Sequence, residues 1–145
     1  MVDLSIERVD HVTPELLVAF ERLMHQLTKA PVPSAAELHE LLDSQSVLIV
    51  ARVSGADSLI IGAATLGVFR TPSGLHAHIE DVIVDEVFRG QGCGEALVQG
   101  LLQIARGMGL DGVSLTCNAR RAAANQLYQK MGFKQWETNV YWYVL

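Results

Sequence analysis

A nearly continuous apolar run at residues 47–53 constrains the fold more than any other part of this sequence. A strand with one solvated face alternates apolar and polar residues, whereas a strand buried on both faces is apolar almost throughout. The run therefore predicts a sheet that is covered on both faces. Two longer strand-like runs follow, at residues 59–69 and 76–85, with a turn at residues 71–74 between them. Together the three runs predict an antiparallel meander.

Two helices are expected before this meander, and both carry start signals. Thr13 precedes a proline and an apolar face of helical spacing over residues 14–29, which is the pattern of an N-cap and a first-turn proline. Ser34 and Glu37 have the spacing of a capping box, which predicts a short second helix. Residues 4–10 alternate in polarity and predict an edge strand.

Two further helices and the remaining strands are expected after the meander. Apolar residues keep a helical period up to Gly109, and Asn118 can cap a last helix that ends at Gly132. Residues 113–117 predict a short strand, and residues 133–145 predict an aromatic-rich terminal strand. The expected order is β-α-α-β-β-β-α-β-α-β-β. It describes an α/β (or α+β) fold with a mixed, mostly antiparallel sheet of roughly six to seven strands and about four helices.

The composition limits the classes of partner. Half of the 145 residues are apolar, which is enough for one core, so we expect a single domain over residues 1–145. The 11 basic and 16 acidic side chains give a net charge of −5, which argues against a nucleic-acid binder. No apolar stretch is long enough for a membrane helix. No charged, apolar leader follows Met1, and Cys93 lies far from Cys117, so we expect a cytoplasmic protein with reduced thiols.

The charge is distributed unevenly along the chain. Residues 1–84 hold 5 basic and 11 acidic side chains, a net of −6, whereas residues 85–134 hold 6 basic and 4 acidic side chains, a net of +2. Either this asymmetry is an accident of composition, or the first segment attracts a cation and the later one meets an anion.

A glycine-rich loop between a strand and a helix is the most informative segment for function. Gly90, Gly92 and Gly94 separate the last run of the meander from the third helical pattern. Glycines permit positive φ and the close approach of a ligand, and the first turn of a helix offers unpaired N–H groups. The loop therefore predicts a phosphate or pyrophosphate site, to which Arg89 can add a charge; the other interpretation is a tight turn without a ligand. The loop has no lysine for a Walker motif, and Glu95 stands where a dinucleotide fingerprint needs glycine.

This loop resembles the acetyl-CoA motif of the GNAT superfamily of N-acetyltransferases. Arg89-x-x-Gly92-x-Gly94 follows the pattern Arg/Gln-x-x-Gly-x-Gly/Ala and comes after the strand residues 79–84, as in that family. The Ile-Glu-Asp-Val run that begins at residue 79 is also similar to the corresponding strand of glucosamine-6-phosphate N-acetyltransferases.

A second segment is similar to the other signature of the family, Asn-x-x-Ala-x-x-Leu-Tyr-x-x-x-Gly-Phe. Asn118 and residues 125–133 carry it, with Leu127 and Tyr128 aligned, although Ala124 precedes the asparagine instead of following it. Both motifs occur in the expected order. The resemblance implies a GNAT-type fold over most of the chain, with acetyl-CoA as co-substrate and no metal.

The resemblance also implies how the donor is held. The backbone of residues 82–84 would pair with the pantetheine arm as an added strand does, and the N–H groups of residues 89–94 would hold the pyrophosphate. Two asparagines of the second motif would contact the cofactor as well. The implied cofactor-binding residues are Val82, Ile83, Val84, Arg89, Gly90, Gln91, Gly92, Cys93, Gly94, Asn118 and Asn125.

Two residues would transfer protons. Tyr128 would be the general acid that protonates the departing thiolate, a modest transfer because the pKa of a thiol is about 8.5 and that of tyrosine about 10. From its place on an apolar helix face alone, Tyr128 would be a core aromatic. Glu80 would take the proton of the amine, directly or through a water, or would serve only in positioning or in an ion pair. Asp81 points to the opposite face if the strand is regularly pleated. The resemblance implies that this strand can carry a β-bulge, as it often does in the family, and a bulge would upset that parity.

The acceptor contacts are expected on the same strand. Asp81 and His78 would contact the substrate. His76, His78 and Glu80 share one strand face, a pattern that is also found in metal sites. A third firm ligand is not evident, so we expect no metal. Cys117 has no histidine partner placed by the sequence for acyl-enzyme chemistry.

We therefore expect an acetyl-CoA-dependent N-acetyltransferase. It would move an acetyl group to a primary amine of a small molecule by direct transfer in a ternary complex. It would act as a monomer or homodimer, with neither nucleic acid nor membrane as a partner. Two alternatives stay open: acetylation of a protein N-terminus or lysine, and a non-catalytic acyl-CoA-binding sensor.

Overall fold

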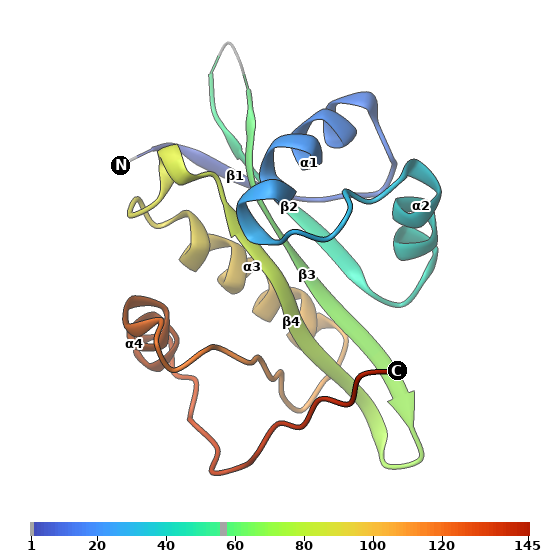
Figure 1. Ribbon diagram of the computed structural model, residues 1–145, viewed down its shortest axis with the longest axis vertical. Helices are drawn as coiled ribbons and strands as arrows, with labels where there is room; N and C mark the ends of the chain where they lie inside the picture. The colour runs from blue at the N-terminus through green and yellow to red at the C-terminus, as the bar shows by residue number, and fades with distance from the viewer. Residues whose placement is uncertain (1, 56–57) are drawn as a thin grey trace. The chain divides into compact units, whose positions relative to one another are not determined.

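The computed structural model describes residues 2–55 and 58–145, and the chain forms two compact units, Met1–Leu115 and Thr116–Leu145. The first unit holds a β-sheet and three α-helices, and the second holds one α-helix (Figure 1). The expectation of one domain over the whole chain stays a prediction. Within the described residues, no helix combines the length and the apolar character that crossing a bilayer requires.

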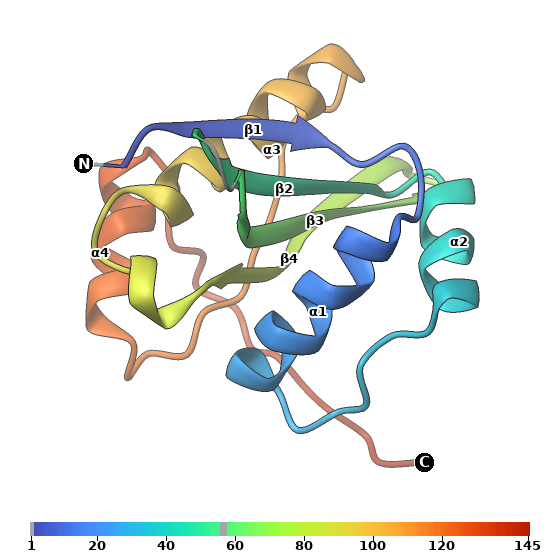
Figure 2. The same cartoon turned by 90° about the horizontal axis from the view of Figure 1, so that it is seen from above.

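The sheet of the first unit is an antiparallel meander, as predicted. Its strands are β1 (Leu4–Arg8), β2 (Val47–Val53), β3 (Ile60–Thr71) and β4 (Gly74–Val84), and each pairs with the next in the order β1-β2-β3-β4. Figure 2 shows the four strands side by side in this order. The edge strand predicted at residues 4–10 is confirmed over Leu4–Arg8, because in the described sheet β1 pairs with β2 alone.

Both N-terminal helices begin where their capping residues predict. Helix α1 (Pro14–Leu27) follows Thr13, whose Oγ1 accepts a hydrogen bond from the N–H of Leu16 at 3.1 Å. Helix α2 (Ala35–Asp43) follows Ser34, which forms both hydrogen bonds of the capping box with Glu37. These side chains satisfy N–H groups that the first helical turn leaves without a backbone partner.

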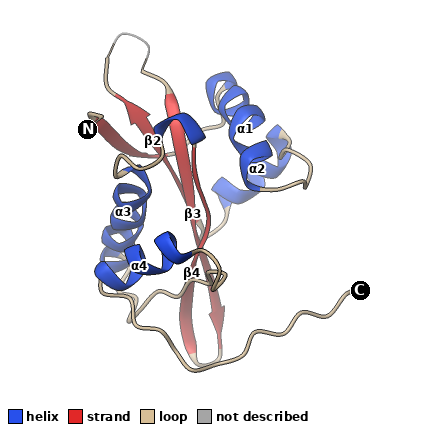
Figure 3. Cartoon of the chain, turned by 60° about the vertical axis from the view of Figure 1, so that its left-hand side comes forward, coloured by secondary structure: helices blue, strands red, loops and turns tan. Residues whose placement is uncertain are grey.

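Helices cover both faces of the sheet. Helices α1 and α2 lie on one face, and α3 (Cys93–Gly107) lies on the other (Figure 3). Strand β2 is buried between them: Leu48 and Val50 belong to the core cluster under α1 and α2, while Ile49 lies against Gly100 of α3. Continuous apolar character at residues 47–53 therefore did indicate a strand with two covered faces.

The expected sheet of six to seven strands is wrong for the described residues, which form four. In place of a strand at 113–117, Ser114 makes a single parallel bridge to His78. Residues 133–145 form no strand, and their side chains from Val140 onward are exposed. Alternating polarity gives a strand only where a neighbouring edge accepts its backbone hydrogen bonds, and residues 116–145, which are all described, contain no strand with which residues 133–145 could pair. The mixed helix-and-sheet class and the four α-helices are confirmed.

Gly62 of β3 permits α3 to approach the sheet, which gives a test of the packing. A Cβ on Gly62 would lie 2.8 Å from the carbonyl oxygen of Ile83 and 3.1 Å from Leu97 Cδ1. A Cβ on Gly67 of the same strand would meet only the carbonyl oxygen of His78, at an ordinary 3.6 Å. We expect Gly62→Ala to lower the free energy of unfolding in urea by about 1–3 kcal/mol and Gly67→Ala to change it by less than about 0.5 kcal/mol. Equal stability of the two variants would contradict this packing.

Candidate active site

A β-bulge in β4 determines where its acidic side chains point. Ala63 pairs with Ile83 and Thr65 pairs with Glu80, so two residues of β4 lie opposite one residue of β3 between these pairs. Asp81, the first residue of the bulge, has a φ of +51°, a left-handed conformation that aspartate tolerates better than most residues. The bulge removes the parity of regular pleating, and Asp81 lines the same cavity as Ile83 and Thr65.

That cavity has a volume of about 240 Å³ and lies on the face of the sheet covered by α1 and α2. Apolar side chains such as Phe20 and Met24 from α1 and Leu38 from α2 form much of its wall. Glu37, whose Oε2 accepts from the N–H of Ser34, and Asp81 also line it, and none of the described residues that line it is Lys, Arg or His. An apolar cavity with two carboxylates favours a small ligand that carries a positive charge.

Glu80 and the two histidines of β4 share the face on which this cavity opens. Glu80 pairs with Thr65, which lines the cavity, while His78 pairs with Gly67 and His76 with Phe69. In an antiparallel pair, directly opposed residues point to the same side of the sheet. The bulge therefore brings Glu80 and Asp81 to one face, where regular pleating would separate them.

The histidines are held by polar and aromatic partners. Both rings stack on Phe69, with ring-centroid distances of 5.4 Å for His76 and 5.3 Å for His78. The Nε2 of His76 lies 2.8 Å from Thr71 Oγ1, and the Nδ1 of His78 forms a hydrogen bond with the hydroxyl of Ser114. Within residues 2–55 and 58–145, no group of three or more His, Cys, Asp or Glu residues could hold a metal ion.

The outer edge of β4 lacks a strand partner along residues 80–84. Strand β4 ends the sheet, and the bridge at Ser114 uses only the carbonyl of Ala77 and the N–H of Ile79 on that edge. The Arg89 guanidinium Nε donates to the carbonyl of Val84 at 3.0 Å. An open strand edge accepts an extended ligand through main-chain hydrogen bonds, and Val82 and Ile83 lie on this edge.

The chain leaves β4 through a short 3-10 helix, Glu86–Phe88, and enters the glycine loop. Gly90 has a φ of +76° and Gly92 a φ of +84°, the left-handed region that favours glycine. A Cβ at either position would meet no atom within 4 Å, so the loop surface is open at both. Gly92 is the N-cap of α3, and no side chain caps that helix. The first N–H groups of α3 therefore lack a side-chain acceptor, as an anion site requires.

Cys93 contributes its backbone to this loop and its side chain to the core. Its side chain is 2% exposed, and a Cβ on Gly62 would lie 3.3 Å from its Sγ. Burial raises the pKa of the Cys93 thiol to about 11. The thiol is therefore protonated at neutral pH and cannot act as a nucleophile there.

The second unit contains both asparagines of the second motif, and they bind its own backbone. Helix α4 spans Ala122–Lys130 and its N-cap is Arg121, so the prediction that Asn118 caps this helix is wrong. Asn118 Oδ1 instead accepts from the N–H of Arg120 at 2.9 Å and closes the turn before the helix. Asn125 Nδ2 donates to the carbonyl of Asn118 at 3.0 Å and to that of Arg121 at 2.9 Å. The two asparagines therefore fix the start of α4.

Tyr128 lies on α4 with a protonated phenol. Its ring contacts Phe133 edge to face, with centroids 5.7 Å apart. The pKa of Tyr128 is raised, mainly by burial and further by Cys117, while the Arg121 guanidinium lowers it less. Tyr128 therefore holds its proton across the neutral range, the state that a general acid needs.

The predicted site residues fall into two groups. The first unit contains His78, residues 80–84 and residues 89–94, and the second contains Asn118, Asn125 and Tyr128. Of the residues that line the cavity, sequence reasoning singled out Asp81 and Ile83 and missed those of α1 and α2, because the wall comes from separate segments. It also missed Arg22, whose Nε donates to Asp85 Oδ2 at 2.9 Å. One signal was present: an aspartate two residues before Val87 is a local capping pattern, and Asp85 Oδ1 does accept from the Val87 N–H.

Comparisons with known proteins identify the family of this chain. The sequence matches the Acetyltransferase (GNAT) family over residues 13–133. It is 34% identical over 121 residues to the glucosamine 6-phosphate N-acetyltransferase of Trypanosoma brucei brucei, covering 79% of this chain and 80% of that protein. The crystal structure of a Trypanosoma brucei acetyltransferase superposes with a TM-score of 0.77 at 30% identity, covering 98% and 100% of the two chains. AAC(6′)-Iy, 18% identical, shares the fold with a TM-score of 0.77 over 99% of each chain, and its structure holds the bisubstrate analog CoA-S-monomethyl-acetylneamine.

Proposed function

This chain belongs to the GNAT family of acetyltransferases, and we propose that it transfers an acetyl group from acetyl-CoA to a primary amine of a small molecule, directly, in a ternary complex. The observation that carries the proposal is the uncapped N-terminus of α3 next to a strand edge without a partner. The loop amides and the positive end of the helix dipole suit a diphosphate, and the strand edge suits the amide groups of pantetheine.

The residues that line the cavity favour a cationic small molecule as the acceptor. The cavity carboxylates, Glu37 and Asp81, attract an ammonium group and repel a phosphate monoester, and no cation of the described residues lines the cavity to reverse that preference. Relatives of this chain are named for glucosamine 6-phosphate. Asp81 belongs to the run that is similar to the corresponding strand of those enzymes, so it does not by itself exclude a phosphate. We propose that this cavity accepts amines that carry no phosphate, because no Lys, Arg or His among the described residues lines it.

Two side chains carry the proton transfers of the proposed reaction. The amine nitrogen forms a bond to the thioester carbonyl carbon, the carbon–sulfur bond breaks, and CoA leaves as a thiolate. Tyr128 gives its proton to that thiolate. Glu80, on the cavity face of β4, takes the proton that the attacking amine must lose, directly or through a water. An ammonium ion has no lone pair, so this second step decides how much amine can react at neutral pH.

Release of free thiol from acetyl-CoA tests the activity. The purified protein is offered matched acceptors: glucosamine against glucosamine 6-phosphate, a diamine, and short peptides with a free N-terminus or lysine. Because of the two carboxylates, we expect turnover with the amines that lack phosphate and at least tenfold lower kcat/KM with glucosamine 6-phosphate. Preference for the phosphorylated sugar would contradict the charge argument, and preference for peptides would favour protein acetylation. CoA binding without turnover on any acceptor would favour a sensor.

The pH dependence of two isosteric variants separates the acid from the base. Tyr128→Phe is expected to lower kcat by about 10²-fold or more and to leave the Kd for CoA within twofold. The pKa of Tyr128 is raised above its usual value of about 10. At every pH up to about 9, deprotonation of Tyr128 should therefore cause no loss of the wild-type rate. Glu80→Gln is expected to lower kcat/KM most near pH 7, with the deficit shrinking as the amine deprotonates at higher pH.

The kcat of Tyr128→Phe and the pH dependence of Glu80→Gln can each contradict the role proposed for that residue. If Tyr128→Phe keeps the wild-type kcat, Tyr128 is a core aromatic and the proton comes from elsewhere. If the deficit of Glu80→Gln is the same from pH 7 to pH 10, Glu80 positions the substrate and does not act as a base.

A further inference from the structure

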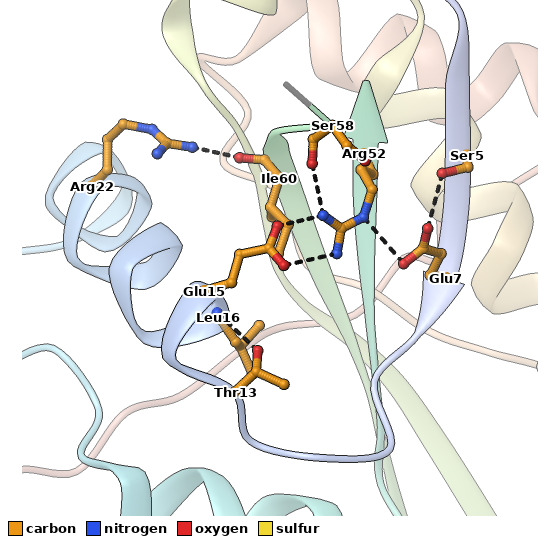
Figure 4. Close-up of polar contacts among 9 residues, drawn as sticks. All are labelled: Ser5, Glu7, Thr13, Glu15, Leu16, Arg22, Arg52, Ser58 and Ile60. Carbon is orange, nitrogen blue, oxygen red and sulfur yellow. Dashed lines mark hydrogen bonds and ion pairs between the residues drawn. The ribbon is translucent and has the colours of Figure 1, made fainter. Parts of the chain in front are cut away.

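Arg22 of α1 reaches across to the point where β4 ends. Its Nε donates to Asp85 Oδ2 at 2.9 Å, and its guanidinium also donates to the carbonyl of Ile60 at the start of β3. Figure 4 shows this second contact. Asp85 is the one buried charged side chain among the described residues, at 6% exposure. A buried carboxylate requires a charge partner and hydrogen bonds, and Arg22 supplies the charge.

The same helix holds the next residue of the loop. Gln26, one helical turn after Arg22, accepts a hydrogen bond from the N–H of Glu86 through its Oε1 at 2.8 Å. Asp85 itself is fixed by its N–H, which donates to the carbonyl of Ile61 at 2.8 Å, and by its Oδ1, which accepts from the N–H of Val87 at 3.2 Å. Residues 85–87 are therefore held from two sides, by β3 and by α1.

We propose that Arg22 is a positioning residue for the donor, acting through Asp85 on the loop that leads to Gly90 and Gly92. The proposal rests on the proposed function, because it assigns that loop to the diphosphate of acetyl-CoA. Only a few residues separate Asp85 from the first glycine. Backbone amides bind an anion well only when their directions are fixed beforehand. A change in the direction of Asp85 reaches those amides through the short 3-10 helix.

The ion pair between Arg22 and Asp85 also links the proposed donor loop to the proposed acceptor cavity. Phe20 and Met24, which flank Arg22 on α1, line the acceptor cavity. One rigid helix therefore contacts the acceptor and holds the start of the donor loop. Arg22 sets the position of the loop relative to that cavity.

Arg52 of β2 provides a matched control, because it contacts the same helix through Glu15. Its guanidinium pairs with Glu15 of α1 and with Glu7 of β1, and it donates to the carbonyl of Ser58 at 2.7 Å (Figure 4). Like Arg22, it joins a carboxylate and a main-chain carbonyl between α1 and the sheet. Unlike Arg22, it forms no hydrogen bond or ion pair with residues 85–94. Loss of Arg52 therefore removes comparable interactions without touching the donor loop.

The experiment compares Arg22→Met, Asp85→Asn and Arg52→Met in the full chain. The Kd for CoA is measured by calorimetry, amide hydrogen exchange is followed over residues 85–94, and Tm is recorded for each variant. We expect Arg22→Met to raise the Kd at least fivefold and Asp85→Asn at least threefold, with faster exchange in the loop. Arg52→Met should lower Tm yet leave the Kd within twofold and the loop exchange unchanged.

Three outcomes would overturn the inference: wild-type affinity in folded Arg22→Met, equal weakening by Arg52→Met, or unchanged loop exchange. Should Arg22→Met fail to fold, wild-type affinity in the isosteric Asp85→Asn variant overturns it instead. If the wild-type chain does not bind CoA, the proposed function fails, and loop exchange in the ligand-free variants alone decides whether Arg22 positions the loop.

Discussion

Strand β4 pairs with β3 along one edge only, and that pairing is interrupted by a bulge. The open edge offers main-chain groups to an extended ligand, and the bulge turns Asp81 toward the cavity beneath α1 and α2. Directly after the C-terminal end of the strand, Asp85 forms an ion pair with Arg22, and the chain then enters the glycine loop through a 3-10 helix. A strand paired along its outer edge would have no free main-chain groups for an extended ligand. A strand without the bulge would not bring Asp81 to the cavity face beside Glu80.

The two halves of the proposed reaction need opposite electrostatics, and this chain provides both within one unit. The N-terminus of α3 carries partial positive charge on amides that no side chain caps. The cavity proposed for the acceptor is lined by Glu37 and Asp81 and, among the described residues, by no Lys, Arg or His. This separation agrees with the uneven charge of the sequence, which is acidic through residue 84 and basic from 85 to 134.

Local signals predicted the elements of the fold that depend on local interactions. Thr13 and Ser34 placed the starts of α1 and α2, and the apolar run of β2 predicted a sheet covered on both faces. The strands expected at 113–117 and 133–145 were wrong because a strand depends on a partner edge, which composition does not reveal. Asn118 was misplaced as a helix cap because the same side chain also closes turns.

The candidate site shows the same division. Gly90, Gly92 and the helix after them were evident from sequence because their chemistry lies in consecutive residues. The cavity and the ion pair between Arg22 and Asp85 both bring together segments more than 60 residues apart. The periodic spacing of apolar residues in a sequence does not reveal such contacts. The bulge at Asp81 was foreseen only through a family resemblance, since its residues carry no local signal of their own.

Binding of CoA to the α3 N-terminus is the interaction on which every functional proposal rests. The most direct test is residue-resolved amide hydrogen exchange with and without saturating CoA. We expect protection at the N–H groups of residues 90–96 and along the free edge of β4, with no comparable change in β1 or α2. Saturable binding that leaves those amides unprotected, or protection centred elsewhere in the chain, would show that the helix terminus does not hold the diphosphate.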